Sequence, residues 1–586
     1  MQQSAQINIF EDKKADMLDK LSILYGKKKS SAIFDELLEI IKKHEISNEK
    51  KWVNQNDVIL ITYADNIKQD GEAPLKTLHK FLKTYVSDFI NSAHILPFYP
   101  YSSDDGFSVI DYYKVNPELG NWNDIEKISD DFQIMFDAVI NHISAKSEWF
   151  NEYLKCNPEY KNFFIEADPT KDYSGVTRPR ALPLLSEFET NNGKKHIWTT
   201  FSADQIDLNY KNEKVFLKII DLLLTYVDHK ANLLRLDAIG YMWKENNTSC
   251  INLPQAHKIV QLMRDVLEIT APHVKIITET NVPHKDNISY FGNGHNEAHM
   301  VYNFSLPPLT LHSFLTGNAK YLSDWAKSLE KEPQSDETTF FNFLASHDGI
   351  GVMPTKGILS DKELNNMIEK VKSHGGLVSY KSNKDGIKSV YELNINYLDA
   401  LSHPDEPQEL KLKRILAAHA ILLSMRGVPG VYIHSLLGSE NFHEGVEQTG
   451  ANRTINREKL HLQKLEEELN NSSSLRYKVF NNLKNLIQIR KQQNAFHPNA
   501  NQKVLSVNPQ VFVLFRTAQN QQNSIISLVN VSNKIQNVCI NLNEHIQENP
   551  DKIKELISGL EIKVLNKKLE LKLEPYQVMW LKLRNK

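Results

Sequence analysis

The sequence predicts a mixed α/β protein whose main domain is a (β/α)8 TIM barrel. We expect inserted subdomains after the third and seventh strands, a helical extension at the N-terminus and an antiparallel β domain at the C-terminus. The barrel prediction rests on eight short apolar runs, each followed by polar and helical stretches. Apolar strands separated by helices are typical of a parallel sheet covered on both faces, and eight such units predict a closed barrel.

The helical extension is expected over residues 1–52. Apolar residues recur there at spacings of three and four, as in Met17, Leu18, Leu21 and Leu24. That spacing is the period of an amphipathic helix. An apolar helix face needs a partner, so we expect these helices to pack on the main domain.

The main domain is expected over residues 53–499. Two stretches between its predicted strands, at about 143–230 and about 349–425, are too long for a single crossover helix. Both are therefore expected to hold insertions at the C-terminal ends of the strands. The eight predicted strands are VILITY (58–63), AHILPF (93–98), IMFDAVI (134–140), LLRLDAIG (233–240), VKIITET (274–280), MVYNFSL (300–306), FFNFLAS (340–346) and GVYIHSL (430–436).

The pattern changes at about residue 500. Short strand-like runs such as VFVLFRT, NSIISLVNVS and YQVMWLKL follow one another with turn residues between them. They predict a small antiparallel β domain over residues 500–586.

Composition limits the classes of partner. The 586 residues carry 69 basic and 72 acidic side chains, a net charge of -3. This balance gives no argument for nucleic acid or an anionic membrane. The cysteines, Cys156, Cys250 and Cys539, lie far apart and predict a reducing compartment. Because the sequence also shows no apolar signal core and no run of membrane-spanning length, we expect a cytoplasmic protein.

Polar side chains gather at the predicted C-terminal ends of the strands, where barrel enzymes place their active sites. The fourth run carries Arg235 and Asp237 two residues apart, so both point from one face of an otherwise apolar strand. Glu279 ends the fifth run and Asp348 follows the seventh. Buried carboxylates repel one another and are costly unless paired or used, so several at one barrel end indicate chemistry.

Cleavage of a glycosidic bond needs such a set of carboxylates. A retaining enzyme places a carboxylate nucleophile and a carboxylic acid about 5–5.5 Å apart, across an oxocarbenium-like transition state. A nearby carboxylate raises the pKa of the acid, and a positive neighbour keeps the nucleophile ionised. Arg235 is placed to do the latter for Asp237.

The chain resembles the alpha-amylase family, glycoside hydrolase family 13. DAVINH, RLDAIG, ITETN and ASHD match its four signature regions in order and spacing. The resemblance implies that Asp237 is the nucleophile, Glu279 the general acid/base and Asp348 the third carboxylate, which stabilises the transition state. It also implies that the hydroxyl and charge partners of a glucose subsite are His142, Arg235 and His347.

Further stretches resemble the sucrose phosphorylase subfamily, whose members transfer glucose to and from phosphate. They include HILPFYP, DDGFSVIDY, RPRALP, SHDGIGV, YELN and NRTINR. Charged bidentate groups and aromatic walls are the usual physics of a tight sugar pocket, and arginine suits a phosphate dianion. The resemblance implies that the substrate-binding residues also include Asp104, Phe107, Gln205, Tyr241 and Arg453, and that phosphate and the acceptor meet Arg180, Tyr391 and Glu392.

Within the subfamily the sequence is most similar to those of glucosylglycerate phosphorylases, as VTRPRALPLL, TETNVPHKDNISYFG and GVEQTGANRTINR indicate. The predicted reaction transfers glucose from 2-O-α-D-glucosyl-D-glycerate to phosphate and gives α-D-glucose 1-phosphate. Sucrose, sucrose 6-phosphate and glucosylglycerol phosphorylases remain alternatives, as does a hydrolase or transglucosidase. A non-catalytic sugar-binding protein would be expected to lack one of the three acids.

Two positions depart from the related patterns. Sucrose phosphorylases read Tyr-Gln where this chain reads Tyr391-Glu392, which speaks against fructose as acceptor. Glu392 would repel glycerate if it faced the pocket, so we expect it to bind the hydroxyls of a polyol such as glycerol or to pair with a cation; the cations in the same loops are Arg178, Arg180, Lys381 and Lys384. Asn141 resembles a calcium ligand of amylases, but no acidic cluster accompanies it, so neither a metal nor a cofactor is expected.

Overall fold

The computed structural model describes residues 2–47, 49–332, 335–382, 388–544 and 550–584. Eight parallel strands close into a barrel in the order β1-β16-β12-β11-β10-β9-β4-β3, and each of the eight predicted runs supplies one strand. The (β/α)8 prediction is therefore confirmed. The barrel strands are β1 (Ile59–Thr62), β3 (Ser92–Ile95), β4 (Gln133–Ala138), β9 (Ala231–Leu236), β10 (Lys275–Thr278), β11 (Met300–Tyr302), β12 (Thr339–Phe343) and β16 (Val428–Tyr432).

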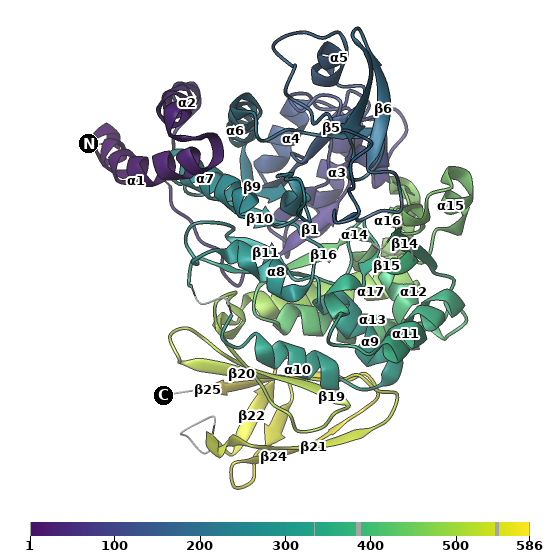
Figure 1. The fold of residues 1–586 in the computed structure, drawn as a ribbon. Helices are drawn as coiled ribbons and strands as arrows, with labels where there is room; N and C mark the ends of the chain where they lie inside the picture. The colour runs from purple at the N-terminus through teal and green to yellow at the C-terminus, as the bar shows by residue number, and fades with distance from the viewer. Residues whose placement is uncertain (1, 48, 333–334, 383–387, 545–549, 585–586) are drawn as a thin grey trace.

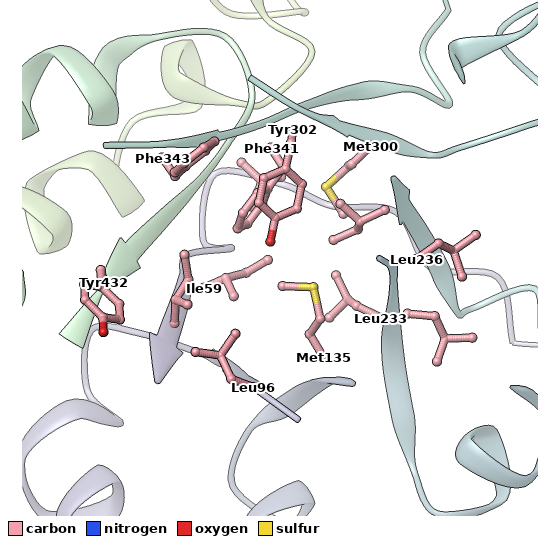
Figure 2. Packing of buried hydrophobic residues seen from close by; sticks show 14 of the residues in the cluster. Ile59, Leu96, Met135, Leu233, Leu236, Met300, Tyr302, Phe341, Phe343 and Tyr432 are labelled. Atoms are coloured by element: carbon pink, nitrogen blue, oxygen red, sulfur yellow. The ribbon is translucent and has the colours of Figure 1, made fainter. Parts of the chain in front are cut away.

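The barrel strands are buried on both faces, which explains their continuous apolar sequences. All residues of β1, β3, β10, β11, β12 and β16 are buried. Side chains from several strands, among them Ile59, Met135, Met300 and Phe341, belong to one hydrophobic cluster, which Figure 2 shows from close by. The packed interior holds the strands in a fixed register and so fixes the residues that follow them.

Helices cover the outside of the barrel, as Figure 1 shows. Asn121 caps α4, because its side chain accepts from the backbone while Asp124 accepts from the backbone of Asn121. The helices that follow the barrel strands are α3 (Pro74–Phe81), continued by a π turn (Leu82–Val86), α4 (Trp122–Ser129), α6 (Glu213–Asp228), α7 (Pro254–Thr270), α8 (His284–Ile288), α9 (Leu306–Thr316), α10 (Lys320–Ser328), α13 (Gln408–Ser424) and α17 (Leu475–Lys491).

Additional elements follow the third and seventh barrel strands. The first group packs as two small two-stranded sheets and a helix: β5 (His142–Ser144), α5 (Glu148–Leu154), β6 (Leu185–Thr190), β7 (Gly193–Trp198) and β8 (Gln205–Asp207). The second comprises β13 (Ile350–Gly351), α11 (Asp361–Ser373), β14 (Leu377–Ser382), β15 (Lys388–Asn394) and α12 (Tyr397–Leu401). The stretches expected to be insertions also contain α6 and α13, which lead into the next barrel strands.

The chain adds further elements after β16. They are α14 (Ile433–Leu436), α15 (His443–Thr449), a 3-10 turn (Asn452–Asn456), β17 (Leu460–His461) and α16 (Leu462–Asn470). Strand β17 pairs with β2 (Ile67–Lys68). This pairing ties the segment after the last barrel strand to the loop after the first.

The N-terminal extension consists of α1 (Gln2–Tyr25) and α2 (Lys27–Ile41), which lie beside α6 and α7 (Figure 1). Met17, Leu21 and Leu37 are fully buried in the main hydrophobic cluster. The buried amine of Lys20 lies 2.5 Å from Asp265 on α7. Apolar packing and a buried ion pair therefore join the extension to the barrel.

The C-terminal segment forms antiparallel sheets, as predicted, with a hydrophobic core of its own. Burial alternates along β21 and β24, which is the pattern of strands with one solvent face. The strands are β18 (Asn501–Val504), β19 (Val511–Thr517), β20 (Asn523–Asn530), β21 (Gln536–Asn541), β22 (Lys552–Glu555), β23 (Glu561–Lys563), β24 (Lys568–Leu573) and β25 (Val578–Arg584). Among the described residues, no helix is long and apolar enough to cross a lipid bilayer.

Candidate active site

One cavity gathers almost all of the predicted site residues at the C-terminal ends of the barrel strands. Arg235 is the one that does not line it. The predicted residues that do line it are Asp104, Phe107, His142, Arg180, Gln205, Asp237, Tyr241, Glu279, His347, Asp348, Tyr391, Glu392 and Arg453. A wider vestibule opens beside it and is also lined by Asp104, Arg180, Tyr391, Glu392 and Arg453.

The guanidinium of Arg235 lies beneath the cavity and holds Asp237. Its Nη1 donates to Asp237 Oδ1 at 2.9 Å and also to Asp137. The parallel pairing of β4 with β9 sets Asp137 opposite Arg235, so the register of the barrel creates this contact. His94 on β3 lies 2.6 Å from the second oxygen of Asp137. Arg235 is thus fixed between two carboxylates, one structural and one facing the cavity.

Glu279 follows β10, the strand next to the one that carries Asp237. Its carboxyl accepts from the backbone N–H of Ala238 at 3.2 Å. Ala238 has a φ of 51°, a left-handed conformation that is costly for a residue with a Cβ atom. That strained turn directs the N–H of Ala238 to Glu279.

Electrostatics separates the roles of the two carboxyl groups. Burial raises the pKa of Glu279, and the charge of Asp348 adds to this. Burial also raises the pKa of Asp237, and Arg235 opposes it. Arg235 lies 2.9 Å from Asp237 but 4.0 Å from Glu279, so the negative charge of the pair is favoured on Asp237 and the proton on Glu279. Such a division suits a nucleophile and a general acid.

Asp348 follows β12 and lies in a network of cations. Arg453 Nη1 lies 2.6 Å and Arg457 Nη2 3.9 Å from its Oδ1. The ring of His347 lies 3.4 Å from the same oxygen, and burial holds the pKa of His347 well below its usual range. His347 is therefore neutral, and the arginines supply the charge that balances Asp348.

The rings of Phe107 and His347 stack with their centroids 4.7 Å apart, and both line the cavity. The carbonyl of Phe107 accepts from Gln205 at 3.0 Å and lies 2.9 Å from His142 Nε2. Tyr241 also lines the cavity, in edge contact with Phe201. Flat rings and oriented polar groups of this kind match the faces and hydroxyls of a pyranose.

Asp104 and Arg180 form an ion pair at the junction of the cavity and the vestibule. Arg180 Nη2 donates to Asp104 Oδ2 at 2.6 Å. Although burial opposes ionisation, Arg180, Arg453 and Arg457 hold the pKa of Asp104 well below its usual range. Asp104 sits in a left-handed turn with a φ of 55°, and a Cβ at Gly106 would lie 2.7 Å from the carbonyl of Pro97. Only glycine fits at position 106 of this turn, from which Asp104 lines the cavity.

Glu392 does not face the cavity as a free charge. It is 2% exposed and accepts from Arg453 Nε at 3.0 Å and Nη2 at 2.7 Å. Pairing with a cation was one of the two expectations, but the partner is Arg453 and not a cation of the inserted loops. Lys381 borders a separate cavity beside Lys356, Arg178 does not line the site, and Lys384 lies outside the described residues.

An amine lies where the amide of Asn141 could have held a cation. Lys244 Nζ donates to Asn141 Oδ1 at 3.0 Å and lies 2.5 Å from Asp207 Oδ2. Both Lys244 and Asp207 are buried. Within the described part of the chain, no group of three or more His, Cys, Asp or Glu side chains is arranged to hold a metal. The expectation that no metal takes part remains a prediction.

Several residues of the site were not predicted from the sequence. Asp137 and His94 support Arg235 from inside the barrel, and Asn456 and Arg457 hold the turn that carries Asp348. A charged residue within the apolar run IMFDAVI was a usable signal for Asp137. Phe201 lies in an inserted segment without a periodic pattern, so its position depended on the fold.

A closed barrel with a buried arginine–carboxylate pair, a second carboxyl that favours its proton and an aromatic-walled cavity defines an enzyme of the carboxylate-based glycoside class. Residues 83–391 match the alpha-amylase catalytic domain. The glucosylglycerate phosphorylase of Spirochaeta thermophila is 46% identical over 579 residues, which cover 96% of this chain and 98% of that protein. That of Escherichia coli strain K12 is 46% identical over 573 residues, with coverages of 97% and 100%.

A structural relative agrees with these sequence matches. The crystal structure of sucrose 6F-phosphate phosphorylase from Thermoanaerobacter thermosaccharolyticum superposes with a TM-score of 0.70 at 26% identity, covering 81% of this chain and 94% of that one. The chain belongs to the glucosylglycerate phosphorylases, a family with the alpha-amylase catalytic domain.

Proposed function

We propose that the protein is a retaining phosphorylase that transfers glucose from 2-O-α-D-glucosyl-D-glycerate to phosphate and releases α-D-glucose 1-phosphate. The observation that carries this proposal is 46% identity to two glucosylglycerate phosphorylases along nearly their whole lengths. The cavity supports it independently, because Arg235 lies 2.9 Å from Asp237 and 4.0 Å from Glu279, which favours the negative charge on the nucleophile of a double displacement.

The first half-reaction breaks the glucosidic bond. Glu279 donates its proton to the leaving oxygen while the carboxylate of Asp237 attacks the anomeric carbon, so glycerate leaves and a covalent β-glucosyl ester forms. Arg235 stabilises Asp237 as an anion before the attack. Asp348 holds sugar hydroxyls and stabilises the positive charge that develops on the ring.

The second half-reaction inverts the same carbon again. Phosphate attacks the glucosyl ester, Glu279 takes up the proton of the attacking oxygen, and Asp237 leaves as a carboxylate. Two inversions give the α-anomer. Hydrolysis follows the same course with water in place of phosphate, so the acceptor subsite decides between a phosphorylase and a hydrolase.

Phosphate and glycerate occupy one subsite in turn, and both are anions. Arg180 lies at the mouth of the glucose cavity and is the cation we assign to them. Its charge is balanced by Asp104, so glucose hydroxyls that engage Asp104 would release Arg180 for the anion. Glu392 does not oppose this, because Arg453 neutralises it.

Phosphate release in the synthetic direction tests the proposal. The protein is incubated with α-D-glucose 1-phosphate and equal concentrations of D-glycerate, glycerol, fructose or fructose 6-phosphate. We expect D-glycerate to give the fastest release. Faster phosphate release with fructose or glycerol would contradict the acceptor assignment and leave the phosphorylase reaction standing. Phosphate release that is as fast without any acceptor as with D-glycerate would indicate a hydrolase.

We further propose that the enzyme acts in the cytoplasm on small molecules alone, with neither nucleic acid nor membrane as a partner. The thiols of Cys156, Cys250 and Cys539 are free, which suits a reducing compartment. The near balance of basic and acidic residues offers no electrostatic footprint for a polyanion.

A further inference from the structure

The turn that carries Asp348 is held by one short segment after the last barrel strand. Asn456 Nδ2 donates to the carbonyl of Ser346 and to the carbonyl of Asp348, both at 3.0 Å. Arg457 Nε donates to the intervening carbonyl of His347 at 2.8 Å. Three successive carbonyls of the turn are thus bound by two adjacent side chains, more than 100 residues away in the sequence.

The amide of Asn456 is built into this position. The residue is 3% exposed, and its backbone carbonyl accepts from the hydroxyl of Tyr432 on β16 at 2.7 Å. Because both partners of the side chain are carbonyl oxygens, its amino group must face them. Its Oδ1 is left without a partner, a cost that a residue needed only for packing would not be expected to carry.

We infer that Asn456 is a positioning residue for the transition-state carboxylate Asp348. Asn456 spans the turn from Ser346 to Asp348, so it fixes the backbone from which Asp348 projects. Arg453 then sets the carboxylate itself at 2.6 Å. Loss of the amide releases two carbonyls and lets the turn shift, and a misplacement of about 1 Å at such a group can cost about a hundredfold in rate.

A second asparagine provides a matched control. It lies at the opposite end of β12, the strand that Asp348 follows. Asn499 is 4% exposed, and its Nδ2 donates to the carbonyl of Thr338 at 2.8 Å and to that of Ser335 at 3.4 Å, just before β12 begins. Asn456 and Asn499 therefore perform the same structural task at the two ends of β12. Only Asn456 does so beside the cavity.

The test compares Asn456→Ala with Asn499→Ala. The inference rests on the proposed function, so the assay is the exchange of labelled phosphate with α-D-glucose 1-phosphate, which proceeds through the glucosyl enzyme whatever the natural acceptor is. If the wild-type protein catalysed no exchange, the proposed function itself would be contradicted. Thermal unfolding temperatures are measured for both variants.

We expect Asn456→Ala to lower kcat for exchange by about tenfold to a hundredfold, with the KM for phosphate within about twofold of wild type. Asn499→Ala should lower the unfolding temperature to a similar degree and keep kcat within about twofold. Retained kcat in Asn456→Ala, or an equal loss of kcat in Asn499→Ala, would overturn the inference. If Asn456→Ala does not fold, Asn456→Ser and Asn456→Asp are compared instead. Serine keeps one hydrogen-bond donor and should retain more activity than aspartate, which has none. Equal activities of these two variants would overturn the inference.

Discussion

Glu392 and Arg453 form a bidentate ion pair, with Nε–Oε1 and Nη2–Oε2 distances of 3.0 and 2.7 Å, and the same guanidinium contacts Asp348. A residue of the second inserted segment is thereby linked through one arginine to a carboxylate of the barrel. We therefore propose that Glu392 acts on the site through Arg453 and not as a charge that an acceptor meets.

Replacing Glu392 tests this indirect role. Glu392→Gln removes the charge that balances Arg453 and weakens a hydrogen bond between charged groups, worth about 1.5–3 kcal/mol. We expect kcat to fall by about tenfold, the equivalent of about 1.4 kcal/mol, while D-glycerate stays the preferred acceptor. Rates with D-glycerate and with fructose at equal concentration are the measurement. A change of preference to fructose would mean that Glu392 reads the acceptor directly.

Arg180→Ala should separate phosphate use from glucose recognition. A charge-assisted contact to phosphate is lost, so the KM for phosphate should rise by about tenfold or more. Hydrolysis of the donor by water should survive better than phosphorolysis. The matched control is Arg178→Ala, a nearby arginine that does not line the cavity and should leave both rates unchanged. An equal fall of hydrolysis and phosphorolysis would assign Arg180 to glucose or to structure.

The proposed acid role of Glu279 predicts a response that depends on the leaving group. Glu279→Gln cannot protonate glycerate, so turnover of glucosylglycerate should fall by about a hundredfold or more. The variant should still be glucosylated by α-D-glucosyl fluoride, because fluoride leaves without a proton. Asp237→Asn should lose activity with both substrates and keep the fold, as circular dichroism can check. Turnover of glucosylglycerate by Asp237→Asn above about a tenth of wild type would assign the nucleophile elsewhere.

The pH dependence follows from the same group. Burial raises the pKa of Glu279, so its acid form persists to a higher pH than an exposed glutamic acid would. Cleavage of glucosylglycerate needs that acid form, so the rate should fall as pH rises through the pKa of Glu279. Glucosyl fluoride should lack this alkaline decline, measured as kcat/KM against pH. An identical decline with both donors would place the ionisation on another group.

Lys244 gives a stability prediction. Lys244→Ala would leave Asp207 buried without its counter-ion, which typically costs about 3–5 kcal/mol. We expect a clearly lower unfolding temperature, and no effect of EDTA on the unfolding temperature of the wild-type protein. The control is Lys211→Ala, whose ion pair with Glu245 is about half exposed and should matter little. A large effect of EDTA would show that a metal, and not Lys244, balances Asp207.

The barrel and the gathering of three carboxyl groups at one end of it could be predicted because their signals are local. Each buried parallel strand is one apolar run, and Asp237, Glu279 and Asp348 stand directly at the ends of such runs. The ends of the insertions were harder to place, because α6 and α13 are helices that a sequence pattern does not separate from the elements before them.

Pairings between distant segments could not be predicted. The contact of Arg235 with Asp137 depends on the register of two strands, and that of Glu392 with Arg453 joins residues 61 positions apart. Asn456 holds the turn of Asp348 from 108 positions away. Charge type alone left several partners open for Glu392, and only the folded chain selects one.

The most direct test of the proposed reaction is to incubate the protein with 2-O-α-D-glucosyl-D-glycerate and phosphate and to identify the sugar product. We expect α-D-glucose 1-phosphate to accumulate together with D-glycerate, and free glucose to be a minor product. Free glucose as the main product, or the β-anomer of glucose 1-phosphate, would contradict the proposed reaction.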